Sequence, residues 1–90
     1  MKIKEGFVLR SVAGNWVVLP MGDPSVKLNG MLTLNDSGKL LWDILQQGAD
    51  RETLVNGICA EYEISPDTAA ADVEKFLEAL SKVGCLAESV

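Results

Sequence analysis

The order of hydrophobic and polar residues divides the chain into a strand-rich first third and a helical remainder. Three short runs, residues 7–12, 16–19 and 31–34, are rich in β-branched, aromatic and aliphatic residues, which favour strands. After residue 35 the apolar positions recur at the i, i+3, i+4 spacing of amphipathic helices. The pattern therefore predicts an α+β fold in which three short antiparallel strands precede three helices.

The first two strands form a predicted hairpin. Gly14 and Asn15 suit its two-residue turn, because both residue types accept positive φ at low steric cost. This turn would set Val12 opposite Val17 and place Trp16 on the other face. The residues expected on the core face are Val8, Val12, Val17, Leu19 and Met21.

The third predicted strand, residues 31–34, runs directly into a helix. Asn29-Gly30 before it is a strong turn signal. Alternation along the strand gives each face two side chains. The two pairs are Leu32 with Leu34, and Met31 with Thr33.

The three predicted helices begin at the capping residues Asn35, Asp50 and Ser65. Gly48 and Gly84 are expected to end the first and the third. Their apolar stripes predict one shared core. The stripes contain Leu40, Leu41, Ile44 and Leu45 with Trp42 at the border, then Leu54, Val55, Ile58, Cys59 and Tyr62, then Ala69, Val73, Phe76, Leu77, Leu80 and Val83.

Residues 85–87 are expected to cross the core as a short extended tail. Short strands followed by three helices with tight connections predict a winged helix-turn-helix arrangement, in a single domain over residues 1–90.

Charge and composition narrow the function. The 90 residues include 8 basic and 13 acidic ones, a net charge of −5, which disfavours nucleic acid binding because binding to phosphates normally needs a basic patch. No apolar run approaches the length of a membrane span, and no hydrophobic segment follows the N-terminal charges as in a signal peptide. We therefore expect a cytoplasmic protein, whose two cysteines are reduced and packed.

Candidate catalytic and metal-binding groups are sparse. The chain has no histidine, the usual general base and the commonest metal ligand. Its acidic pairs lie beside basic residues or on polar faces, which is typical of solvated helix surface, and its glycines form no phosphate-binding spacing. We expect no catalytic residues, no cofactor and no metal site.

The remaining candidate is the edge of the third strand. An edge strand carries unpaired N–H and C=O groups that accept a partner strand. The third predicted helix has three small residues, Ala69, Ala70 and Ala71, near its start, which would leave a shallow groove beside that strand. The predicted border of the groove consists of Asp72, Lys75, Phe76, Ala79 and Val83. From the residues alone, a peptide groove and a merely half-buried helix border are equally consistent with this pattern.

The chain resembles the PqqD-like family. The strongest likeness is Leu34-Asn35-Asp36-Ser37-Gly38, then Leu41-Trp42-Asp43-Ile44-Leu45 and Gly48, with Ser37 where the family often has threonine. Weaker matches extend the likeness from about Phe7 to Leu86. They are Trp16-Val17-Val18-Leu19, Leu54-Val55, Tyr62-Glu63-Ile64, Asp72-Val73, Phe76-Leu77, Leu80 and Gly84-Cys85-Leu86.

This resemblance implies a peptide chaperone, also called a RiPP precursor peptide recognition element. Such domains bind the leader of a ribosomally made precursor as an added strand and present it to a modifying enzyme, which for PqqD is a radical SAM enzyme. Carried over to this sequence, the peptide-binding residues are Met31, Leu32, Thr33, Leu34, Asp72, Lys75, Phe76 and Ala79.

Two rival functions stay open at this point. A winged-helix DNA-binding regulator would have a similar helix layout, but its recognition helix should carry several exposed basic residues. The third helix here has only Lys75 and Lys82 against four acidic residues. A scaffold module could instead pair its exposed strand edge with a second copy of itself.

Overall fold

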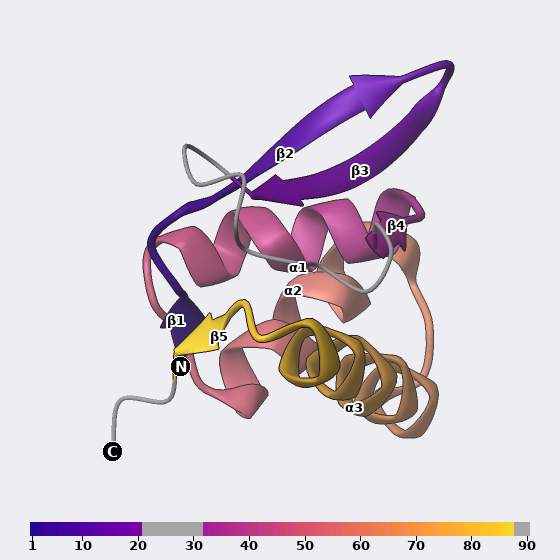
Figure 1. Ribbon diagram of the computed structural model, residues 1–90. Helices are drawn as coiled ribbons and strands as arrows, with labels where there is room; N and C mark the ends of the chain where they lie inside the picture. Colours follow the sequence, from indigo (N-terminus) through magenta and orange to yellow (C-terminus); the bar gives the residue numbers. More distant parts are fainter. Residues whose placement is uncertain (21–31, 88–90) are drawn as a thin grey trace.

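Three helices follow the strands in the order that the apolar periodicity predicts. The computed structural model describes residues 1–20 and 32–87. Within these residues the helices are α1 (Asp36–Gln46), α2 (Arg51–Tyr62) and α3 (Pro66–Val83). Figure 1 shows the β-hairpin above α1 and α3 below it. None of these helices is long and apolar enough to cross a lipid bilayer.

Each helix begins at its predicted cap. The side chains of Asn35, Asp50 and Ser65 accept hydrogen bonds from the backbone N–H three residues further on. Such bonds satisfy one of the four N–H groups that a helix leaves without a partner. Gly84 ends α3 with a φ of 76°, a left-handed conformation that glycine adopts without strain. The predicted helix boundaries are thus confirmed to within a residue or two.

Five strands lie in the described residues. The strands β2 (Phe7–Val12), β3 (Asn15–Pro20) and β4 (Leu32–Leu34) form an antiparallel sheet in the order β2-β3-β4, and confirm the three predicted strands. A separate pair joins the two ends of the described chain, β1 (Lys2–Ile3) and β5 (Leu86–Ala87). The predicted extended tail therefore forms a strand, whereas β1 was not predicted. Asn29-Gly30 lies outside the described residues.

The predicted turn of the β2–β3 hairpin was wrong by one residue. Its two central residues are Ala13 and Gly14, with φ values of 51° and 82°, and Val12 pairs with Asn15 rather than with Val17. Two positive φ values match the twist of the flanking strands. Alanine fills the first position although a left-handed conformation is uncommon for it, so its sequence signal was weak.

The predicted core face of the hairpin was also wrong. Val18 is buried in the main core and Trp16 packs against it, while Val12 on the opposite face is 51% exposed. The register extends this apolar face, because Trp16 pairs with Leu34 and Val18 with Leu32. The face that carries the larger apolar side chains is therefore buried. Val17 is buried as well, although it is not part of the main core cluster, and Met21 lies outside the described residues.

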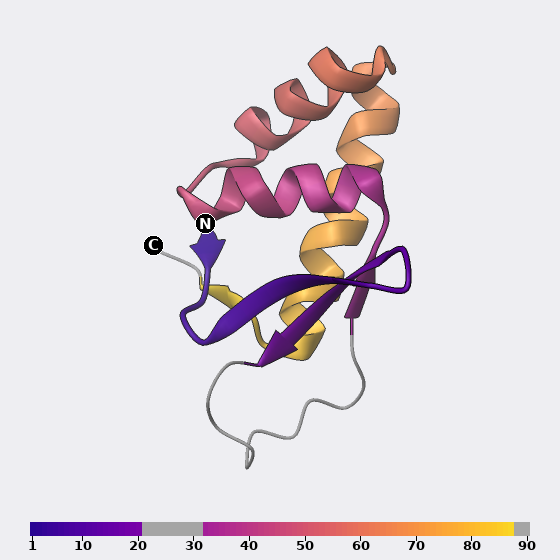
Figure 2. The same cartoon turned by 90° about the horizontal axis from the view of Figure 1, so that it is seen from above.

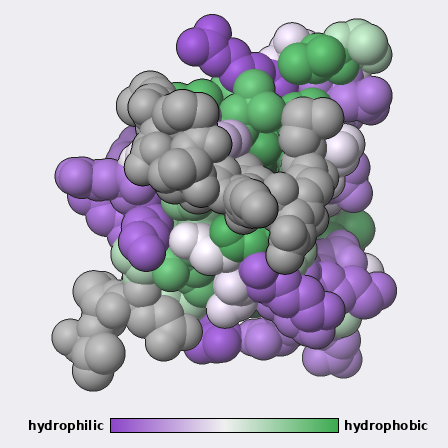
Figure 3. Space-filling model, viewed as in Figure 1, coloured by the Kyte–Doolittle hydropathy of each residue, from purple (hydrophilic) through white to green (hydrophobic). Residues whose placement is uncertain are grey.

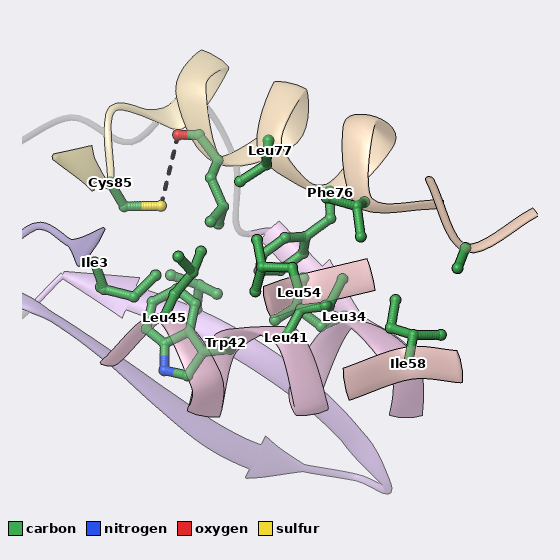
Figure 4. Close-up of a cluster of buried hydrophobic side chains, with 14 residues drawn as sticks. Ile3, Leu34, Leu41, Trp42, Leu45, Leu54, Ile58, Phe76, Leu77 and Cys85 are labelled. Carbon is green, nitrogen blue, oxygen red and sulfur yellow. Dashed lines mark hydrogen bonds between the residues drawn. The ribbon is translucent and has the colours of Figure 1, made fainter. Parts of the chain in front are cut away.

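One hydrophobic core joins the helices to the sheet (Figure 4). Trp42 is only 2% exposed, which confirms its prediction as a core residue. Leu34 brings β4 into the same core, where it meets side chains of α1 and α3. The buried members are Ile3, Val18, Leu34, Leu41, Trp42, Leu45, Leu54, Ile58, Ala69, Val73, Phe76, Leu77, Leu80 and Cys85.

The two cysteines, both in the described part of the chain, are free thiols, as predicted. Cys59 is half-buried, whereas Cys85 is fully buried and its Sγ lies 3.6 Å from the carbonyl oxygen of Leu80 (Figure 4). Burial raises the pKa of the Cys85 thiol from 9.0 to about 11, because the thiolate loses its hydration.

We predict that replacing Asn35 by alanine lowers the free energy of unfolding by about 1 kcal/mol. The Asn35 Oδ1 accepts hydrogen bonds from the Gly38 N–H at 2.8 Å and from the Ser37 hydroxyl at 2.9 Å, and alanine provides neither. Urea unfolding followed by circular dichroism measures the change. Asn35→Asp is the control and should keep most of the stability, since aspartate is an equally good cap.

We predict that Cys85 destabilises the fold only in alkali. The folded thiol keeps its proton up to a pH of about 11, whereas the unfolded thiol loses it near 9.0. The unfolded state therefore binds fewer protons between these values, and stability falls as the pH rises through this window. Unfolding curves of the wild type and of Cys85→Ala measure this, because all other groups titrate in both. Parallel pH profiles for the two proteins would contradict the prediction.

Candidate functional site

The outer edge of β4 is the first component of the candidate site. Among the described strands, β4 pairs with β3 alone. The two-residue turn makes Val12 and Asn15 the hydrogen-bonded closing pair of the hairpin, and hydrogen-bonded pairs alternate along antiparallel strands. By this alternation Val17 bonds toward β2, so its partner Thr33 on β4 directs its N–H and C=O away from β3. These groups face the open edge.

A groove with a volume of about 480 Å³ lies along this edge, between β4 and α3. The two elements run in opposite directions, as Figure 2 shows. The lining residues are Asn15, Leu32, Thr33, Leu34, Asn35, Ser37, Gly38, Leu41, Asp72, Lys75, Phe76 and Ala79. Figure 3, viewed as Figure 1, shows small hydrophobic areas among hydrophilic side chains on this face of the molecule.

The groove has an apolar floor and a polar rim. Phe76, 7% exposed, and the buried Leu41 belong to the main core, so the floor is fixed by tight packing. At the rim, Thr33 and Lys75 are exposed and Asp72 is half-buried. Neither Asp72 nor Lys75 forms an ion pair within the described part of the chain. The rim therefore offers one charge of each sign to a ligand.

Seven of the eight predicted site residues line this one groove. They are Leu32, Thr33, Leu34, Asp72, Lys75, Phe76 and Ala79. The eighth, Met31, lies outside the described residues. Because these seven residues line one groove, the predicted strand and helix do face each other. The role of the residues in binding stays a prediction.

The groove is not opened by the three alanines that were predicted to leave space for it. Ala79 lines it, but none of Ala69, Ala70 and Ala71 does, and Val83 packs against the core instead. Ala69 is fully buried because it lies on the inner face of the first turns of α3.

Sequence reasoning missed part of the lining. Asn35, Ser37 and Gly38 were assigned only to the start of α1, yet all three also line the groove. Gly38 has a specific role there, since a Cβ at this position would lie 3.2 Å from the Leu34 Cβ and 3.2 Å from the Asn35 Oδ1. Their position just after an edge strand is the sequence feature that could have predicted that they also line the groove.

The described residues contain no group of three or more acidic, cysteine or histidine side chains that could hold a metal ion. The pKa of Asp50 is lowered, first by the hydrogen bond from the Thr53 hydroxyl and then by that from the Thr53 N–H. Asp50 caps α2 and does not line the groove. The charge of Asp50 therefore stabilises a helix. The groove, with its apolar floor and the strand edge beside it, is suited to binding through backbone groups and apolar contacts.

Comparison with known proteins agrees with this geometry. Residues 15–86 match the family model described as coenzyme PQQ synthesis protein D (PqqD). The chain belongs to the PqqD family. The match covers β3, β4 and all three helices, and therefore both walls of the groove. The resemblance found in the sequence is thus confirmed.

A solved structure supports the same assignment. This PqqD-family chain is similar to TbiB1, whose structure was solved in complex with the TbiA(beta) leader peptide, with 28% identity and a TM-score of 0.76. The similarity covers 100% of this chain and 99% of the TbiB1 chain. It confirms the predicted order of antiparallel strands and then three helices. A search of curated protein sequences gave no match. Neither similarity supports the DNA-binding alternative.

Proposed function

We propose that this chain is a non-catalytic recognition element that binds the leader of a ribosomally synthesised precursor peptide. The observation that carries the proposal is the outer edge of β4, which has no partner among the described strands and faces an apolar groove along α3. Membership of the PqqD family and the leader-bound state of the similar TbiB1 structure support this choice of ligand.

The leader would bind by strand addition. The N–H and C=O of Thr33 face the open edge and would pair with the backbone of the leader, which gives affinity that depends little on sequence. Alternate side chains of the added strand would lie over the groove floor at Phe76 and Leu41. The floor would therefore select leaders by the size and polarity of these side chains. Asp72 and Lys75 at the rim would favour leader residues of opposite charge.

The bound leader would be presented to a modifying enzyme, a radical SAM enzyme or another maturase. The chain itself supplies no catalytic group to this reaction in our proposal. A scaffold role through self-association is the second candidate, because the outer edge of β2 is also unpaired among the described strands. Measuring the molecular mass in solution with and without leader separates the two, since only self-association gives a dimer without peptide.

The direct test is a titration of ¹⁵N-labelled protein with the leader peptide of the precursor encoded beside its gene. We expect the largest amide shifts at residues 32–34 and on α3 from Asp72 to Ala79. Shifts confined to other regions would show that the groove is not the binding site.

We predict that Thr33→Pro reduces leader affinity at least about tenfold, because it removes an N–H that faces the added strand. Proline is tolerated where a strand N–H points to an open edge, so the fold should persist. Calorimetric titration measures affinity and circular dichroism the fold. Thr33→Val, which keeps the N–H, is the matched control and should bind nearly as well as the wild type.

We predict that Ala79→Leu also weakens leader binding, because the larger side chain fills the groove from the wall formed by α3. The helix should tolerate it, since leucine is a good helix former. The matched control is Ala70→Leu, an exposed position of the same helix that does not line the groove. Equal affinities of the two variants in the same calorimetric titration would argue against the groove.

A further inference from the structure

A second hollow continues the groove past the end of β4. Its volume is about 360 Å³, and Asn35, Ser37 and Asp72 line both the groove and the hollow. Its other lining residues come from the first turn of α1, from α2 and from the segment between α2 and α3. They are Asp36, Ile58, Tyr62 and Ile64.

The hollow has an apolar floor that the fold leaves partly open. Ile58 is fully buried at its base, and Ile64 is half-buried and packs against the core. Tyr62 was predicted to belong to the buried stripe of α2, yet it is 41% exposed. Among the described residues only Val12 is a more exposed large hydrophobic residue. An aromatic ring that is left at the edge of a hollow offers a contact surface for another apolar side chain.

The charges around this hollow have one sign. Asp36 and Asp72 both line it, and no lysine or arginine among the described residues does. Lys75, the cation of the groove, lies one helical turn away from Asp72 and does not line the hollow. The site therefore combines an apolar floor with an acidic rim, which favours an apolar side chain next to a cationic one.

We propose that this hollow binds a basic–apolar residue pair of the same peptide that lies in the groove, and so selects among leaders. The inference rests on the proposed function, because the groove gives the hollow its ligand. Asn35 directly follows β4, and Ser37 lies in the first turn of α1. The pair would therefore lie about two to four residues beyond the added strand, at roughly 3.3 Å per residue.

The polarity of the sheet indicates which end of the peptide reaches the hollow. The β2-β3-β4 sheet is entirely antiparallel, and a strand added in the same sense would run opposite to β4. Its N-terminal end would then lie beside Asn35. The basic–apolar pair is therefore placed on the N-terminal side of the leader segment that pairs with β4.

Dipeptides test the hollow without any leader. The probes are Ac-Arg-Leu-NH₂, its charge-reversed form Ac-Glu-Leu-NH₂, and Ac-Arg-Gly-NH₂, which lacks the apolar side chain. In titrations of the ¹⁵N-labelled full chain, we expect Ac-Arg-Leu-NH₂ to shift the amides of Asp36, Ser37, Tyr62 and Ile64 with a Kd of about 1 mM or weaker. The other two probes should bind at least about threefold more weakly.

Variants separate the two contributions. Tyr62→Ala should weaken Ac-Arg-Leu-NH₂ by about fivefold, because the apolar contact is lost. Asp36→Asn should remove most of the preference for arginine over glutamate. Asp67→Asn is the matched control, because Asp67 also lies in the first turn of a helix but lines none of these hollows.

The outcomes distinguish this inference from the proposed function. Absence of Ac-Arg-Leu-NH₂ shifts at the hollow, or equal binding of Ac-Glu-Leu-NH₂, would overturn the inference. Leader-induced shifts at residues 32–34 would then still support the groove. If Tyr62→Ala fails to fold, the comparison of the three dipeptides on the wild-type chain alone decides the question.

Discussion

The fold depends on the junction at which β4 ends and α1 begins. Leu34 is buried in the core, and the next residue, Asn35, caps the helix, so the strand has no room to continue. Gly38 makes the junction tight, because any side chain there would press on both residues. The consequence is a three-residue strand whose position is fixed from both sides while its outer edge has no partner among the described strands. Stability and an open edge thus arise from the same contacts.

A rigid edge next to a helix is a favourable place to bind an extended peptide. The groove floor belongs to the main core, since Phe76 and Leu41 pack among its buried side chains. Its shape therefore needs little rearrangement, and binding loses less free energy to the ordering of the protein. A chain of 90 residues has limited stability in reserve. In the proposed complex, backbone pairing along an existing strand would let the chain bind a peptide with little rearrangement.

The sequence predicted what local chemistry determines. Caps at Asn35, Asp50 and Ser65 and the period of α3 depend on neighbouring residues, and they were found in place. The same period placed Asp72, Lys75, Phe76 and Ala79 beside β4, along one groove. The core face of the hairpin was not predictable in this way, because both faces of β2 and β3 are apolar and tertiary packing selects between them. The β1–β5 pair joins two-residue strands from opposite ends of the described chain, which no local pattern indicates. The exposure of Tyr62 likewise depends on where α2 ends against its neighbours.

Charged side chains along the groove would supply the selectivity for peptide sequence and register that backbone pairing does not give. Hydrogen bonds to a strand edge are similar for many peptide sequences, so they fix neither the sequence nor the register of the ligand. Lys75 lies along the groove, whereas Asp72 and Asp36 lie toward its end at the start of α1. A peptide shifted by two residues would keep its backbone hydrogen bonds. Its charged side chains, however, would no longer lie opposite Lys75, Asp72 and Asp36. In the proposed complex, a positive side chain followed by a negative one along the peptide would therefore set the register and direction of the peptide, which the strand edge alone leaves open.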